Sequence, residues 1–122
     1  MQELPRNEWL TFLDSFSTEH QGWLVDLEIV SPGKGTRVEA NAMPFVGITA
    51  DLSRGDGETL YVMLGRAPED HLTHTVRGVS HVRLRESDEG AHEAVEIGSN
   101  TGETTRVRFR SVVLPEMVNG IV

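Results

Sequence analysis

The sequence has no cysteine, which excludes disulfide bonds, thiolate catalysis and cysteine-based metal sites. It also has no apolar run long enough to span a membrane, and residues 1–6 lack the apolar core of a signal peptide. The glycines around Lys34 do not have the spacing of a phosphate-binding loop, and no cofactor is expected. These absences predict a cytoplasmic protein with no membrane partner.

Positive charge is also scarce in this chain. It carries 11 Lys and Arg residues against 19 Asp and Glu residues, which gives a formal net charge of −8. Proteins that bind duplex DNA or anionic membranes normally carry the opposite charge, because phosphates attract basic surfaces. The sequence therefore predicts no binding to nucleic acid.

What the chain does contain is typical of one globular domain. Its 122 residues are 38% hydrophobic, which is enough for one core, and no repeat or linker divides residues 1–122. Residues 6–17 are predicted to form a helix, which Gly22 follows. Four apolar residues of this segment have the i, i+3, i+4, i+7 spacing of one helical stripe: Trp9, Phe12, Leu13 and Phe16.

A period of two replaces the helical period between residues 22 and 111. Short alternating segments are separated by turn signals about every ten residues, which favours strands joined by hairpins. The pattern predicts a mainly β fold, in which the N-terminal helix packs on a twisted antiparallel sheet that forms a roll or small barrel. A two-sheet sandwich is the alternative. The tail, residues 112–122, is apolar and irregular and is expected to fold back over an open end of the sheet.

Two hairpins have a predicted register. A four-residue loop at 32–35 keeps the apolar residues of the first hairpin on one face and places Glu28 opposite Glu39. A three-residue loop closed by Gly102, preceded by a four-residue loop at 88–91, aligns three further strands. Their outer face then carries a row of alternating charge formed by Arg83, Glu96 and Arg106, flanked by Arg85, Arg108 and Arg110.

This charged row has two interpretations. Opposite charges on neighbouring strands stabilise the register and discourage aggregation, which is the more common role of such a ladder. Alternatively, the arginines outnumber the acids beside them and bind a phosphate or carboxylate. The residues of that anion site are Arg83, Arg106 and Arg108, together with Glu96.

The histidines are the second candidate site. His71 and His74 have a spacing that suits two metal ligands on a helix, and His81 could join them from the next strand. On a strand, however, residues three apart point to opposite faces. A four-residue turn at 77–80 would send His74 outward, and a five-residue turn at 77–81 would send it inward, so the sequence leaves both orientations open.

Apolar residues on the predicted outer face form the third candidate surface. The alternation assigns five residues to it: Leu24, Met43, Phe45, Tyr61 and Met63. A contiguous patch of this size would exceed what a monomer usually exposes. It indicates either a homodimer interface or a surface covered by the N-terminal helix.

Several segments also resemble a known family. The N-terminal Glu3-Leu4-Pro5-Arg6, the central His71-Leu72-Thr73-His74-Thr75 and the late Leu114-Pro115-Glu116-Met117-Val118 are similar to those of small bacterial proteins classified as a domain of unknown function. The resemblance runs along the whole chain and implies a stand-alone bacterial protein. It implies no activity, cofactor or catalytic residue.

Three functions are consistent with the sequence. Because no catalytic constellation can be read from the spacing, we expect a non-enzymatic accessory or protein-interaction module, binding a protein partner or forming a homodimer. The alternatives are a protein that binds a small anion through its arginines and a small enzyme centred on His74, with or without a metal ion.

Overall fold

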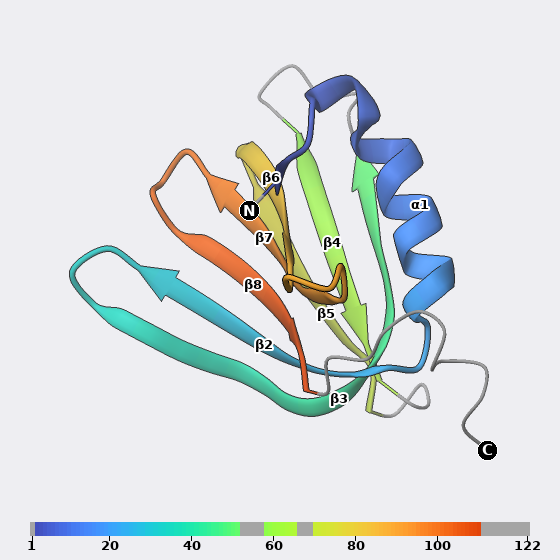
Figure 1. Cartoon of the computed structure of the whole chain (residues 1–122). Helices are drawn as coiled ribbons and strands as arrows, with labels where there is room; N and C mark the ends of the chain where they lie inside the picture. Colours follow the sequence, from blue (N-terminus) through green and yellow to red (C-terminus); the bar gives the residue numbers. More distant parts are fainter. Residues whose placement is uncertain (1, 52–57, 66–69, 111–122) are drawn as a thin grey trace.

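A computed structural model describes residues 2–51, 58–65 and 70–110 of the chain. These residues form an N-terminal helix and eight strands (Figure 1). The elements in chain order are β1 Gln2–Glu3, the 3-10 helix η1 Arg6–Glu8, α1 Trp9–His20, β2 Leu24–Ser31, β3 Gly35–Asp51, β4 Thr59–Leu64, β5 Leu72–Arg77, β6 Val79–Glu86, β7 His92–Ser99 and β8 Thr104–Phe109.

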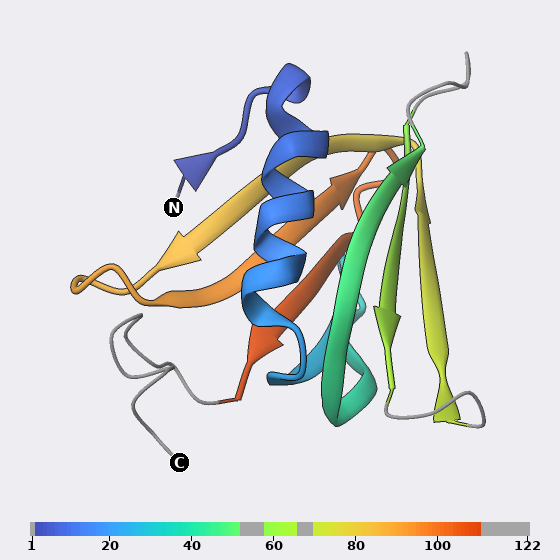
Figure 2. The same ribbon diagram turned by 90° about the vertical axis from the view of Figure 1, so that its right-hand side faces the viewer.

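All eight strands belong to one antiparallel sheet, in the order β1-β6-β7-β8-β2-β3-β4-β5. The sheet curls around its core, so that β6, β7 and β8 cross behind α1 while β4 and β5 stand to one side of it (Figure 2). The prediction of a mainly β fold with one N-terminal helix is confirmed. Within the described residues the sheet ends at β1 and β5, so it forms an open roll and not a closed barrel.

The predicted helix is present and is longer than expected. One turn of 3-10 helix precedes α1, which continues three residues beyond the predicted end at 17, to His20. Its predicted stripe faces the core, where Trp9, Leu13 and Phe16 are buried and Phe12 is partly buried. The chain then turns at Gly22, whose φ of +90° lies in the left-handed region that favours glycine. No helix in the described part of the chain is long and apolar enough to cross a membrane.

The long strand β3 bends and so belongs to both halves of the roll. Its first half pairs with β2, and the segment Phe45–Asp51 pairs with β4. The bend lies near Ala42, which has a φ of +54°, and register shifts flank it on both sides. On the side away from β4, α1 lies along the second half of β3. There the Ser17 hydroxyl accepts a hydrogen bond from the Ile48 N–H (2.9 Å) and donates one to the Ile48 carbonyl (3.4 Å).

The bend also corrects one predicted assignment. Phe45 was assigned to the outer face, but it is 1% exposed and packs edge-on against Phe16 and Phe109 in the core. The register shift between Phe45 and Gly47 reverses the alternation at this point, which a strict period of two cannot anticipate. The remaining large exposed apolar residues among those described are Leu10, Leu24 and Val38, which lie on three different elements. The predicted outer apolar patch therefore loses its central aromatic residue.

The two predicted hairpin registers differ in accuracy. In the second, Val95 pairs with Val107, Glu96 with Arg106 and Arg83 with Glu96, as predicted. In the first, Ser31 pairs with Gly35, so the loop has three residues and Glu28 lies opposite Val38 instead of Glu39. The loop between β6 and β7 is also one residue shorter than predicted, because a bulge after Arg85 takes up the difference.

A sharp corner replaces the predicted turn between β5 and β6. The two strands do not pair with each other: β5 pairs with β4, and β6 pairs with β7 and β1. Gly78, with φ +63°, connects them, and its carbonyl accepts a hydrogen bond from the Asn100 N–H (2.8 Å). Neither turn considered for His74 is therefore formed. The predicted tail, residues 112–122, lies outside the described residues.

Candidate functional site

An open cleft lies between β5 and the hairpin formed by β7 and β8. It has a volume of about 350 Å³, within the range of small-molecule and peptide sites. One wall is formed by part of β5 and the other by the end of the β7–β8 hairpin, and no residue of α1 lines it. The lining residues are His74, Thr75, Val76, Arg77, Ser99, Thr101, Glu103 and Thr105.

The cleft lies along the edge of β5 and not over one of its faces. Consecutive residues of a strand point to opposite faces, so a cavity over one face is lined by every second residue. Here four consecutive residues, 74–77, line the cleft. Since β5 is the last strand of the sheet, the backbone edge away from β4 forms this wall.

His74 is the titratable group at the centre of the cleft. It is half-buried on the inward face of β5, the face that also carries the buried Val76. Its Nε2 lies 3.3 Å from Oγ1 of the buried Thr105. Burial lowers the pKa of His74 below the ordinary value of 6.5, with Glu39 acting in the opposite direction. His74 is therefore neutral at physiological pH.

The two charged residues of the cleft differ in their contacts. Glu103 accepts a hydrogen bond from the Ser31 hydroxyl (3.0 Å), which links β2 to the cleft wall. Arg77 is exposed, and within the described part of the chain it has no ion pair. The lining of the cleft thus includes one carboxylate bonded to a hydroxyl and one exposed arginine that has no ion pair among the described residues.

These groups do not make a complete catalytic site. A nucleophile and its base normally lie within about 2.6–3.2 Å, and a third group orients the base. The separation between His74 and Thr105 is slightly longer, and among the described residues His74 has no hydrogen bond to a carboxylate or carbonyl. Among the described residues, the cleft therefore lacks a nucleophile held by an oriented base.

The other predicted metal ligands lie apart from His74. His71 is exposed and contacts the Thr73 hydroxyl (2.9 Å), and His81 lies on β6 beside the Ser80 hydroxyl (3.1 Å). No group of three or more His, Asp or Glu side chains in the described ranges could hold a metal ion. The structure therefore brings His74 into a site but does not bring the three histidines together.

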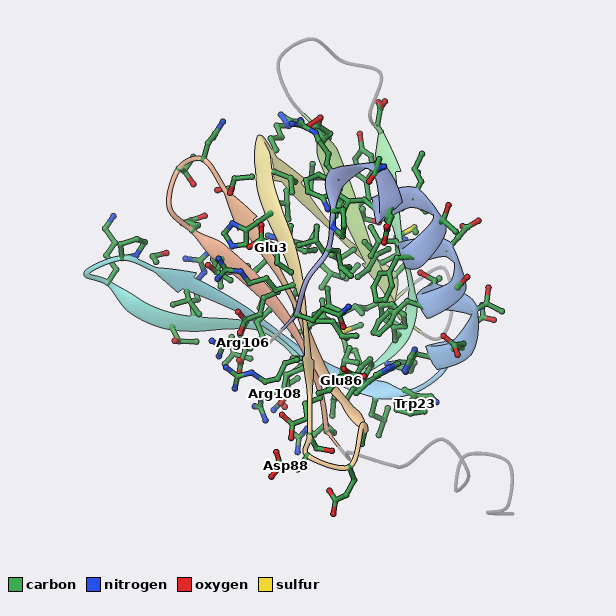
Figure 3. The ribbon with its side chains drawn as sticks, turned by 45° about the horizontal axis from the view of Figure 1, so that its top comes forward. Glu3, Trp23, Glu86, Asp88, Arg106 and Arg108 are labelled. Carbon is green, nitrogen blue, oxygen red and sulfur yellow. The ribbon has the colours of Figure 1, made fainter. Side chains whose placement is uncertain are left out.

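The predicted arginine row lies on the outer face of the sheet, where Arg106 and Arg108 lie next to each other (Figure 3). Arg106 donates to Glu96 (3.0 Å) and to Glu28 (3.2 Å), and Arg83 pairs with Glu3 (3.3 Å). Each of these three contacts joins neighbouring strands of the sheet.

The row continues across β2 through two more arginines. Arg108 donates to Glu28 (3.0 Å) and Asp26 (3.1 Å), and Arg110 donates to Asp26 (3.1 Å) and also contacts Asn41. The hydrogen bond to Glu28 and its charge raise the pKa of Arg108 further. Asp26 also accepts the N–H of Ala42 (2.8 Å) at the bend of β3.

Sequence reasoning missed the acids that balance this row. Asp26 and Glu28 are 5% and 8% exposed although they face outward, because the arginine side chains cover them. The sequence shows that these two acids alternate with Val25 and Leu27. It does not show which arginines they meet, because the pairing of β2 with β8 joins distant segments of the chain. With these acids in place, the shortage of carboxylates that motivated an anion site is no longer present.

A second group of residues was also missed, at the C-terminal end of α1. His20 contacts the Phe16 carbonyl through Nδ1 (2.8 Å) and Nδ1 of His92 through Nε2 (2.9 Å). Nε2 of His92 lies 3.6 Å from Glu86. The His20 ring is 3% exposed and stacks on Phe16, and burial lowers its pKa. The i, i+4 spacing of Phe16 and His20 is the sequence feature that could have placed His20 on the buried face of the helix.

Comparison with known proteins identifies the family. A family model matches residues 1–116, so the chain belongs to that family, which is described as a family of unknown function (DUF5335). The match confirms the resemblance found in the sequence. No curated protein and no solved structure matches the chain.

Proposed function

We propose that this member of the DUF5335 family is a non-enzymatic protein-interaction module, and that it holds a segment of a partner protein in the cleft beside β5. The observation that carries the proposal is the cleft itself, open along the edge of a terminal strand and lined by side chains from three elements. The backbone edge of β5 faces the residues of the β7–β8 hairpin there, as in sites that fix an extended ligand by main-chain hydrogen bonds.

Two further observations favour binding over catalysis or anion capture. His74 and Thr105 lack the orienting group that a nucleophilic pair requires, among the residues described. The arginines of the outer face are matched by Glu3, Asp26, Glu28 and Glu96. A surface ladder of this kind aligns strands and leaves little positive potential for a free anion.

The proposal is tested by photo-crosslinking in the cells that make the protein. A photoreactive phenylalanine analogue is placed at Thr75, which lines the cleft, or at Arg85, which is exposed on β6 outside it. We expect discrete adducts with a partner protein from position 75 and none from position 85. Equal labelling from both positions, or none from either, contradicts the proposal.

A blocking substitution shows whether the adduct depends on the cleft. Thr101 is an exposed turn residue at the cleft wall, so Thr101→Trp fills the opening without changing the core. Lys34→Trp adds the same ring to the exposed β2–β3 loop and is the matched control. The adduct from position 75 should be lost with Thr101→Trp and kept with Lys34→Trp. An adduct that survives both substitutions is not formed in the cleft.

A further inference from the structure

The geometry points to β-strand addition: we infer that the partner segment is an extended, acidic peptide that pairs with the free edge of β5. This inference rests on the proposed function and specifies both the binding mode and the chemistry of the partner. In this mode the main chain of the ligand supplies affinity through hydrogen bonds with the edge strand, and pockets for alternate side chains supply specificity.

The backbone of β5 is available for such pairing. Its residues pair with β4 from Leu64↔Leu72 to Thr59↔Arg77, and no other strand in the described sheet pairs with it. In an antiparallel ladder alternate residues direct their N–H and C=O groups to opposite sides, so half of these groups in β5 face the cleft. An edge strand with unpaired groups is a template for another strand.

The opposite wall is shaped for an extended chain. The corner at Gly78 brings the end of β5 close to Asn100, which fixes one end of the cleft. Glu103 and Thr105 are two residues apart and so lie on the same side of the chain as it enters β8. Of these two, Glu103 is exposed to a bound segment, whereas Thr105 is buried and contacts His74 across the cleft.

Charge determines the chemistry of the partner. The Glu103 carboxylate keeps its charge, because its bonded partner is the neutral Ser31 hydroxyl, whereas Arg77 has no acidic partner among the described residues. Arg77 lies on the exposed face of β5, and a peptide residue paired with it would carry its side chain on that same face, where a carboxylate is the favoured cross-strand partner of a guanidinium. An acidic residue in the segment is therefore favoured, and it is placed near the β5–β6 corner where Arg77 lies.

The test uses random linear peptides displayed on phage, selected for binding to the whole protein, with the selected peptides then synthesised. Hydrogen exchange of the β5 amides is followed by NMR with and without a bound peptide. Strand addition should protect alternate amides within residues 72–77, because the others are already bonded to β4. The selected sequences should share an acidic residue.

The role of charge is tested with two matched variants. Arg77→Gln should weaken peptide binding by about tenfold, because the peptide carboxylate loses its partner. Arg85→Gln removes an equally exposed arginine without an ion pair among the described residues, and it should leave binding unchanged. Equal losses in both variants would indicate a general effect of net charge and would overturn the acidic-partner assignment.

The outcomes separate this inference from the proposed function. If crosslinking at position 75 succeeds but selected peptides protect no β5 amide, or protect residues elsewhere, strand addition is wrong and the interaction module stands. If no peptide can be selected while the crosslink persists, the partner is not a linear segment and the inference fails again. If the crosslink itself is absent, the proposed function fails.

Discussion

Acidification is predicted to weaken the fold through the buried contact between α1 and β7. His20 ends α1, and its ring lies among Phe16, Trp23 and Phe109 while its Nε2 meets His92. Nδ1 of His20 faces a carbonyl oxygen, which only accepts hydrogen bonds, so Nδ1 carries the proton and Nε2 is the acceptor in the neutral ring. A second proton on His20 would face the N–H of His92 and break this contact.

The direction of the pH effect follows from the pKa of His20. Burial, and then the neighbouring His92, lower this pKa below 6.5, whereas the Phe16 carbonyl and Glu19 act to raise it. As pH falls below about 6.5, His20 therefore binds a proton more readily in the unfolded chain than in the folded chain. Stability is highest above that pH and falls through the window between 6.5 and the lower pKa of the folded protein.

The magnitude follows from linkage. One such histidine changes the free energy of unfolding by at most about 1.4 kcal/mol per pH unit. His74 has its pKa lowered in the same direction and adds a similar slope, so the two together contribute at most about 2.8 kcal/mol per unit.

Urea denaturation between about pH 7.5 and about pH 5 measures this slope. His20→Gln keeps a polar side chain but cannot titrate, so its slope should be smaller than that of the wild type by up to about 1.4 kcal/mol per unit. His74→Gln should remove the part of the pH slope that comes from His74. Thr11→Gln, at an exposed position of α1, removes no titratable group and is the control, which should leave the slope unchanged. An unchanged slope in His20→Gln, or a fold that becomes more stable in acid, would refute the reasoning.

Three further substitutions test the packing, each by the free energy of unfolding. Asp26→Ala should lower the free energy of unfolding by about 2–3 kcal/mol, because the N–H of Ala42 loses its acceptor while Arg108 and Arg110 keep partial access to water. If exposed Asp88→Ala lowers it by the same amount, Asp26 does not stabilise the fold through these contacts. Phe16→Ala should lower the free energy of unfolding by about 3–5 kcal/mol, and Leu10→Ala, at an exposed position of the same helix, should lower it far less. Similar losses in the two variants would mean that α1 is not held to the sheet by its apolar stripe. Gly65→Ala should be more destabilising than Gly90→Ala, since both have positive φ but only at position 65 would the added Cβ press against backbone, the carbonyl oxygen of Asp70 (2.8 Å). The reverse order would exclude this close approach of the chain.

Local signals predicted the parts of the fold that depend on neighbouring residues. The stripe of α1 follows from the spacing of its apolar residues, and the β7–β8 register follows from one hairpin loop closed by Gly102, whose φ is +95°. The bend of β3 was missed because a bulge adds a residue without changing composition. Separate register shifts account for the two errors: one beside Glu39, where the β2–β3 loop also has three residues instead of four, and one between Phe45 and Gly47.

Most of the candidate site depends on contacts between distant segments. His74 was recognised from its motif, but the cleft exists because β5 turns at Gly78 instead of pairing with β6. Thr105 and Glu103 reach it from a hairpin almost thirty residues further along. No periodicity encodes such a contact. The sequence therefore identified His74 as a candidate site residue but did not predict its position between β5 and the β7–β8 hairpin.

The contact between Ser17 and Ile48 has a consequence for the behaviour of the protein in a crowded cell. By bonding both backbone groups of Ile48, a helix side chain occupies a strand edge that would otherwise be open to a second molecule. Any event that detaches α1, whether a mutation, heat or acid, uncovers that edge together with the apolar groove beneath the helix. Detachment would therefore turn a partly folded chain into a seed for aggregation well before the sheet itself unfolds.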